Sequence, residues 1–109
     1  MLKEIMKDLG AVTGQFTGNY VYSVFVDGEK KYIGRGVGLR YMHPLSGKSS
    51  CALLNRDFFK GRLIQVVCTH NNLSKRHAVS IEAEMIGYLV YLALHDGEEV
   101  YNKQVPTHS

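Results

Sequence analysis

Hydrophobic residues gather in short strand-like runs in the first third of the chain and in one later run. Residues 20–26 are mostly aromatic and β-branched, which suits a pleated, half-buried strand. The pair Asp27-Gly28 is a hairpin turn signal, and residues 29–33 return as a second strand. Residues 63–68 are almost continuously apolar, as expected for a central strand. These segments predict a small, mainly antiparallel three-stranded sheet.

Three other segments have the period of a helix. Residues 2–9 and about 50–60 each carry a short apolar stripe, and residues 75–95 carry a longer one after Ser74, which is a good N-cap. The glycine-containing residues 10–19 predict a loop. Helices flanking a small sheet define an α+β fold, and a chain of 109 residues is the size of a single domain, residues 1–109.

The hairpin turn decides whether Tyr22 and Tyr32 share a face of the sheet. A strict two-residue loop places Tyr32 across from Ser23, on the face opposite Tyr22. A loop of odd length, or a β-bulge, places both tyrosines on one face. The sequence leaves both arrangements open.

A glycine-rich stretch follows the second strand. Residues 34–38 read Gly-Arg-Gly-Val-Gly, and Leu39 follows them, so the spacing matches neither a dinucleotide-binding fingerprint nor a P-loop. The glycines instead predict a tight turn and a close approach of the backbone to another group.

Glu82 lies within the apolar face of the last predicted helix, three or four residues from Ala78, Met85 and Ile86, whereas Glu84 projects from the far side. A carboxylate on a core face is costly unless it is paired or binds a cation. Glu82 is therefore either a partner of a lysine or arginine at the edge of the core or part of a functional site.

The net charge is +3 and the isoelectric point is about 8.9, which is compatible with a polyanionic partner but too modest to establish one. The basic residues gather in two groups, Lys30, Lys31, Arg35 and Arg40, then Lys48, Arg56, Lys60 and Arg62. An ordinary solvated surface explains such groups equally well.

Neither cysteine indicates a disulfide, because Cys51 and Cys68 have no paired spacing. Cys68, His70 and His77 could make a small metal-binding regulator, or a buried thiol beside surface histidines. The N-terminus has no apolar signal-peptide core, and the apolar run 85–94 is shorter than the roughly 20 residues that span a bilayer. We expect a cytoplasmic protein with no membrane partner.

Several of these residues together resemble the motifs of the GIY-YIG nucleases. Tyr20-Val21-Tyr22 and Tyr32-Ile33-Gly34 match the two tyrosine motifs, with Tyr20 in place of the first glycine. The later motif residues are matched, in order, by Arg40, His43, Glu82 and Asn102. The form Tyr-Ile-Gly-Arg-Gly-x-Gly-x-Arg is similar to a branch that includes small bacterial and phage members.

The resemblance implies a GIY-YIG-like fold and a metal-dependent endonuclease that hydrolyses phosphodiester bonds in DNA. Glu82 would hold one Mg²⁺ or Mn²⁺, and Arg40 would bind phosphate oxygens. Tyr22 would orient or deprotonate the attacking water, and Tyr32 would hydrogen-bond the water or the phosphate. His43 would support Tyr22, and Asn102 would position the site. A phenol with a pKa near 10 is a poor base, so Arg40, His43 or the metal would have to favour its phenolate.

The same resemblance implies how DNA is bound. Arg35, Lys48, Arg56 and Lys60 would contact its backbone. The substrate would be branched DNA or duplex of low sequence specificity, and cutting both strands would need a homodimer. The alternative is an inactive nucleic-acid-binding module of the same fold.

Overall fold

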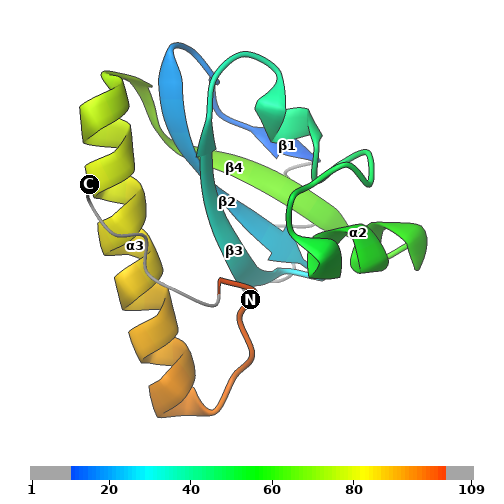
Figure 1. The fold of residues 1–109 in the computed structure, drawn as a ribbon. Coiled ribbons are helices and arrows are strands. Elements are labelled where there is room, and N and C mark those ends of the chain that lie inside the picture. Colours follow the sequence, from blue (N-terminus) through cyan, green and yellow to red (C-terminus); the bar gives the residue numbers. More distant parts are fainter. Residues whose placement is uncertain (1–10, 103–109) are drawn as a thin grey trace.

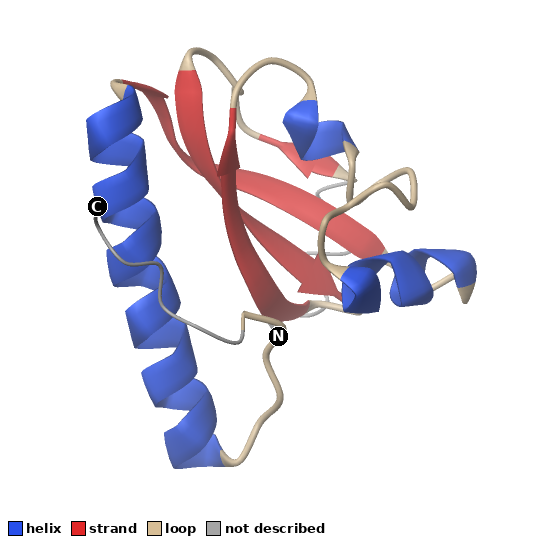
Figure 2. Cartoon of the chain, viewed as in Figure 1, coloured by secondary structure: helices blue, strands red, loops and turns tan. Residues whose placement is uncertain are grey.

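A computed structural model describes residues 11–102 as a four-stranded mixed sheet with the strand order β1-β4-β2-β3, accompanied by two α-helices (Figures 1 and 2). The strands are β1 (Val12–Thr13), β2 (Asn19–Val26), β3 (Glu29–Gly36) and β4 (Ile64–Leu73). The helices are the short 3₁₀ helix η1 (Arg40–Met42), α2 (Ala52–Phe59) and α3 (Lys75–Asp96). The predicted α+β class is confirmed.

The sheet has one strand more than predicted. Strand β1 lies within residues 10–19, which were predicted to be a loop, and it pairs parallel to β4 through Val12 with Val66 and Thr13 with Val67. Its two residues are too few to show an alternating pattern, so the sequence gives no strand signal there. The helix predicted for residues 2–9 lies outside the described residues.

The β2–β3 hairpin combines a two-residue loop with a bulge. Val26 pairs with Glu29, and both loop residues have positive φ angles, 51° at Asp27 and 83° at Gly28, as in a type I′ turn. Farther along, Phe25 pairs with Lys30 but Val24 pairs with Tyr32, so one extra residue lies in β3. The bulge shifts the register by one and resolves the alternative left open by the sequence.

The two faces of the sheet support separate hydrophobic clusters. Tyr20, Tyr22 and Val24 pack with Leu54 of α2 on one face. On the other face, Val21 and Ile33 pack with three α3 residues, Ala78, Ile86 and Leu89. In Figure 1, α3 accordingly runs along one side of the sheet, while α2 lies near the opposite side. Strand β3 forms an edge of the sheet, where the two faces meet.

Helix α3 closely follows its predicted limits. The Ser74 hydroxyl accepts a hydrogen bond from the His77 amide, and Gly97, with φ at 70°, ends the helix. Glu84 is exposed, as predicted, whereas Glu82 is only partly exposed. By length and composition alone α3 could cross a membrane, a test that core helices of soluble proteins also pass, and here one face of α3 packs on the sheet.

Candidate active site

The hairpin register brings Tyr22 and Tyr32 onto one face of the sheet. Tyr22 pairs with Gly34 across the strands, and Tyr32 lies next to them, opposite Val24. A Cβ atom on Gly34 would lie 2.6 Å from the Tyr22 hydroxyl oxygen and 3.0 Å from a Tyr32 ring carbon. Only glycine leaves room for the Tyr22 ring at this position, so the predicted close backbone approach occurs within the strand.

A cavity of about 450 Å³ opens at the edge of β3, beside the two tyrosines. We call it the tyrosine cavity. Its lining comes from β2, β3, η1, the segment before α2, and α3. The lining residues are Tyr22, Tyr32, Arg35, Arg40, His43, Lys48, Ser49, Ser50 and Glu82. Five of the six residues predicted to be catalytic are therefore in one cavity.

Tyr20 fixes the loop that carries Arg40 and His43. Its buried hydroxyl donates a hydrogen bond of 2.9 Å to the Gly38 carbonyl and accepts one of 3.0 Å from the Tyr41 amide. Helix η1 then turns once, and in a 3₁₀ helix residues three apart lie above one another. This spacing places Arg40 and His43 on the same side, facing the cavity.

Glu82 reaches the tyrosine cavity from α3, on the other side of the β3 edge. Its carboxylate oxygen Oε1 lies 3.3 Å from Nε of Arg35, and its side chain is 13% exposed. Burial raises the pKa of Glu82, while the adjacent Arg35 guanidinium lowers it. The sequence predicted either an ion pair at the edge of the core or a functional carboxylate, and the structure shows an ion pair that opens into a cavity.

The tyrosines of the cavity are held in the protonated form in the protein alone. Burial raises the pKa of Tyr22 far above its usual value, and the neighbouring Tyr32, Tyr20 and Glu82 raise it further. Arg40 lowers this pKa, but its effect is smaller than that of burial. We expected Arg40, His43 or the metal to favour the Tyr22 phenolate; Arg40 acts in that direction without outweighing burial, and the roles of His43 and the metal stay predictions.

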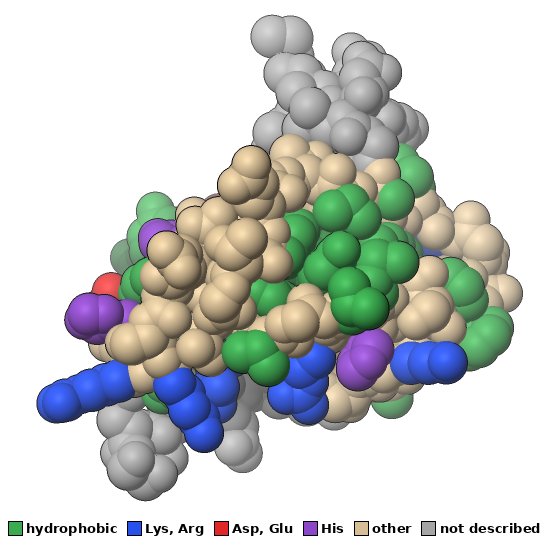
Figure 3. Space-filling view, turned by 90° about the horizontal axis from the view of Figure 1, so that it is seen from above, with side chains coloured by type: hydrophobic (Ala, Val, Ile, Leu, Met, Phe, Trp, Pro, Cys, Tyr) green, Lys and Arg blue, Asp and Glu red, His purple; other side chains and the backbone are tan. Residues whose placement is uncertain are grey.

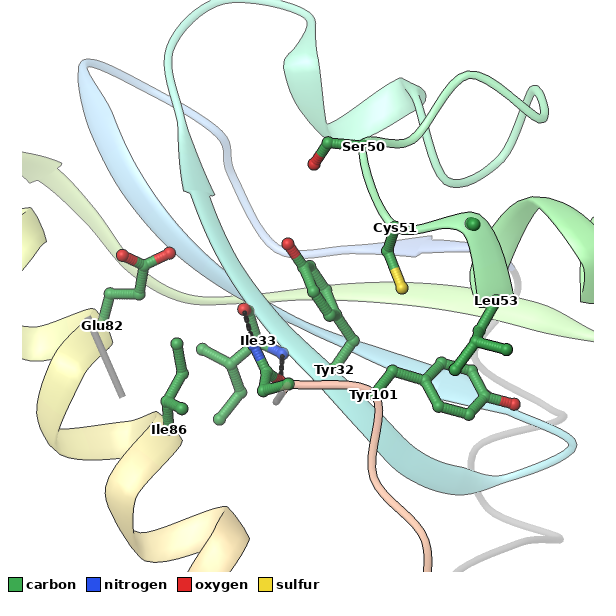
Figure 4. Close-up of a pocket in the computed structure, with 10 residues that line it drawn as sticks. Tyr32, Ile33, Ser50, Cys51, Leu53, Glu82, Ile86 and Tyr101 are labelled. Atoms are coloured by element: carbon green, nitrogen blue, oxygen red, sulfur yellow. Dashed lines mark hydrogen bonds between the residues drawn. The ribbon is translucent and has the colours of Figure 1, made fainter. Parts of the chain in front are cut away.

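Ser50 is a site residue that the sequence did not single out. The second helix was predicted to begin at about residue 50, whereas α2 begins at Ala52, so Ser50 lies in the segment before the helix. Burial raises the pKa of Tyr32, and a hydrogen bond with the Ser50 side chain lowers it. In Figure 4, Ser50 of the segment before α2 lies above Tyr32, and Glu82 of α3 lies to its left. No sequence motif marks this serine, because its role depends on how that segment folds over the hairpin.

Asn102 lies beside the tyrosine cavity and not in its wall. Its carboxamide accepts a hydrogen bond of 2.9 Å from the Ile33 amide and donates one of 3.0 Å to the Ile33 carbonyl. The preceding Tyr101 amide donates 2.7 Å to the carbonyl of Lys31, the extra residue of the bulge. Asn102 and Tyr101 thus pair with the outer edge of β3 next to Tyr32 and fix the strand that carries it.

Asn102 also lines a second hollow of about 500 Å³, which shares Tyr32, Ser50 and Glu82 with the tyrosine cavity (Figure 4). The remaining walls of this hollow are mainly apolar or thiol-bearing, Ile33, Cys51, Ala52, Leu53, Ile86 and Tyr101. The two hollows therefore adjoin at these three shared residues.

The predicted DNA-contacting residues divide into two sets. Arg35 and Lys48 line the tyrosine cavity, whereas Arg56 and Lys60 line neither hollow. Arg56 instead hydrogen-bonds to Asp57 through Nε and Nη2, and Lys60 is exposed at the end of α2. Seen from above, lysine and arginine side chains follow one edge of the molecule, with histidine among them (Figure 3).

The described residues contain no group of three or more histidine, cysteine, aspartate and glutamate side chains arranged to hold a metal ion. Cys68 donates a hydrogen bond to the His70 carbonyl, and the His70 ring contacts the Thr69 hydroxyl. The three residues Cys68, His70 and His77 therefore do not form such a cluster within residues 11–102.

No family model, no curated protein and no solved structure matches this chain.

Proposed function

We propose that this protein is a metal-dependent endonuclease of the GIY-YIG type that hydrolyses phosphodiester bonds in DNA. One observation carries the proposal: Tyr22, Tyr32, Arg40, His43 and Glu82 line one cavity. They come from segments that are up to sixty residues apart in the sequence. Their order matches the family motifs, and their joint presence in one hollow supports a common chemical role.

The residues of the cavity fit a hydrated divalent cation better than a structural metal. Among the described residues, Glu82 is the one carboxylate in the lining of the tyrosine cavity. Mg²⁺ keeps several water ligands and needs only one or two protein carboxylates, whereas zinc sites usually take four protein ligands. Mg²⁺ or Mn²⁺ bound at Glu82 would polarise the phosphoryl oxygens and stabilise the leaving oxygen.

The other side chains of the cavity have complementary roles. Arg40 has a planar guanidinium and is exposed in the cavity wall, so it can bind two phosphate oxygens at once. His43, one turn further on, lines the same cavity, and its imidazole can hydrogen-bond the water or the phosphate. Lys48 adds positive charge near the cavity mouth.

Tyr22 acts as a hydrogen-bonding phenol that orients the attacking water. Its raised pKa keeps the proton on the hydroxyl in the free protein, so it is a poor general base before substrate binds. Deprotonation would need further positive charge near the hydroxyl, which a bound cation supplies. Tyr32, with Ser50 on its hydroxyl, hydrogen-bonds the water or the phosphate.

The substrate class follows from what surrounds the cavity. Within residues 11–102 there is one sheet with its helices and no separate DNA-reading unit, which favours branched DNA or duplex of low sequence specificity. One such cavity cuts one strand, so double-strand cleavage requires two copies. The cytoplasm is the expected location.

The test is cleavage of supercoiled plasmid and of a branched four-way junction by the full chain, with Mg²⁺, with Mn²⁺ and with a chelator. We expect nicking that requires metal and that falls at least about a hundredfold in Glu82→Ala. Glu84→Ala is the matched control, because Glu84 lies on the same helix but is exposed and outside the tyrosine cavity. We expect this control to keep wild-type activity.

Failure of the wild type to cut either substrate with either metal, while it still retards DNA in a gel, would favour the inactive DNA-binding module. Failure to cut and to bind would remove both functions. Equal losses in Glu82→Ala and Glu84→Ala would show that the effect is not specific to the cavity.

A further inference from the structure

The ion pair between Arg35 and Glu82 connects two groups that the proposed function needs separately. Arg35 Nε lies 3.3 Å from Glu82 Oε1 inside the tyrosine cavity. In the proposed mechanism the carboxylate binds the cation, and the positive groups of the cavity bind phosphate. A carboxylate that is paired with a guanidinium is less available to a metal ion, since the two positive charges repel each other.

The position of Arg35 follows from the register of the hairpin. Arg35 pairs with Val21, so it shares the face of the sheet on which Val21 and Ile33 pack against α3. Glu82 is on α3 and meets Arg35 there. Tyr22 and Tyr32 approach the same cavity from the opposite face, so the Arg35–Glu82 pair and the two tyrosines border one space.

The two side chains of the ion pair differ in their contact with solvent. The Glu82 side chain is 13% exposed, and the Arg35 side chain is 37% exposed. The Glu82 carboxylate has little contact with water, so a positive partner offsets the cost of burying its charge. Arg35 has more contact with solvent and three guanidinium nitrogens, so it is the partner that can turn toward an incoming phosphate.

We propose that Arg35 is a positioning residue that neutralises Glu82 until DNA binds, and that it then moves to a phosphate and frees the carboxylate for the divalent cation. This inference rests on the proposed function. It makes DNA binding and metal binding mutually reinforcing, and the two affinities must rise by the same factor because the coupling is reciprocal.

Lys48 provides a matched comparison. It lines the same cavity and carries the same charge, but within residues 11–102 it forms no ion pair with a carboxylate. Removing the charge of either Arg35 or Lys48 reduces the electrostatic repulsion that a metal ion meets in the cavity. Only removal of Arg35 also releases Glu82.

The experiment measures Mn²⁺ binding to the full chain by electron paramagnetic resonance, with and without a short duplex DNA oligonucleotide with phosphorothioate linkages. Without oligonucleotide, we expect Arg35→Gln to bind Mn²⁺ about two- to tenfold more tightly than wild type, and Lys48→Gln to stay within about twofold of it. With oligonucleotide, we expect a larger gain in Mn²⁺ affinity for wild type than for Arg35→Gln. Circular dichroism checks folding, and Arg35→Lys, which keeps the charge, should behave more like wild type.

Equal Mn²⁺ affinities for Arg35→Gln, Lys48→Gln and wild type would overturn the inference, as would an equal oligonucleotide effect in all three. Glu82→Gln separates this failure from a failure of the proposed function. If Glu82→Gln loses Mn²⁺ binding while Arg35→Gln is unchanged, only the role of Arg35 is wrong. If Glu82→Gln binds Mn²⁺ as wild type does, the metal site itself is wrong, and the role of Arg35 falls with it.

Discussion

Two carboxylates lie between the sheet and a helix, and their surroundings differ. Asp57 of α2 is fully buried; its two oxygens accept hydrogen bonds from the Tyr101 hydroxyl and from Arg56, and Arg62 Nη1 lies 3.7 Å away. Among residues 11–102, Glu82 of α3 pairs with Arg35 alone, and it faces a cavity. The first carboxylate is surrounded by partners that hold it, whereas the second remains accessible to a ligand.

The difference distinguishes Asp57, whose charge stabilises the fold, from Glu82, whose charge is available to a ligand. The Asp57 cluster ties α2 to the C-terminal segment, because Tyr101 lies beside the β3 bulge and its hydroxyl reaches α2. That segment also carries Asn102, which holds Ile33 next to Tyr32. The Asp57 cluster therefore supports the strand that forms one wall of the tyrosine cavity. Variants at Asp57 and in the tyrosine cavity can test the two roles separately.

The largest effect on folding is expected for Asp57→Asn. An amide cannot take the place of a carboxylate that balances two arginines, and breaking a buried charged cluster costs about 3 kcal/mol of unfolding free energy. Urea denaturation followed by circular dichroism measures this loss. Asp96→Asn is the control, because Asp96 is exposed at the end of α3 and should change the unfolding free energy by less than about 0.5 kcal/mol. Similar losses in both variants would mean that Asp57 is not a special support.

The sequence predicted only one of these two carboxylates. Asp57 lies in the apolar stripe of its helix, three residues after Leu54, by the same logic that singled out Glu82. Which carboxylate is closed by partners depends on Tyr101, far away in the sequence, and no local pattern shows that contact. The hairpin and the long helix were predictable because their signals are local.

The placement of Tyr22 and Tyr32 on one face also could not be predicted from local sequence signals. The sequence predicted a turn at Asp27-Gly28 and left the loop length open; the loop has two residues, and the bulge that brings Tyr32 beside Tyr22 lies within β3. The carbonyl of the extra residue, Lys31, accepts a hydrogen bond from the Tyr101 amide, so a distant segment stabilises the bulge. The role of Tyr20 in holding the Gly38 loop also depends on tertiary contact.

In the tyrosine cavity beside Glu82, Tyr22→Phe should lower the cleavage rate by about a hundredfold, which corresponds to about 2.7 kcal/mol of transition-state stabilisation. The variant keeps the ring that packs over Gly34 and removes only the hydroxyl, so the fold should be unaffected. Single-turnover cleavage of plasmid measures the rate. Tyr88→Phe is the control, since Tyr88 is exposed on α3 away from the tyrosine cavity. A Tyr22→Phe enzyme as fast as the control would exclude a role for the hydroxyl in orienting water.

In the Asp57 cluster, Tyr101→Phe should lower the unfolding free energy by about 1 kcal/mol, because it removes the hydroxyl that donates a hydrogen bond to Asp57. Burial first, and then the adjacent Asp57, raise the pKa of Tyr101 to about 12. The unfolded phenol loses its proton near pH 10 while the folded one keeps it, so the stability is fully present below about pH 10 and is lost as pH rises toward 12.

Urea denaturation at a series of pH values should therefore show the unfolding free energy of the wild type falling between about pH 10 and 12. In Tyr101→Phe the fall should be shallower, because one of the tyrosines that resists deprotonation is missing; Tyr22 still contributes to the remaining slope. Tyr91→Phe, at an exposed position on α3, should keep the wild-type slope. Parallel curves for Tyr101→Phe and wild type would show that the Asp57 cluster does not control this hydroxyl.

The smallest effect is expected for the stability of Glu82→Gln. Its ion pair with a partly exposed arginine is weak, and removal of the charge also removes the penalty of burying it, so the two effects oppose each other. We expect the unfolding free energy to change by less than about 0.5 kcal/mol, in contrast to Asp57→Asn. The same urea denaturation, at neutral pH, compares the two variants directly. A loss of unfolding free energy in Glu82→Gln as large as that in Asp57→Asn would show that both carboxylates stabilise the fold. The negative charge of Glu82 in the cavity would then be explained by folding and not by a catalytic role.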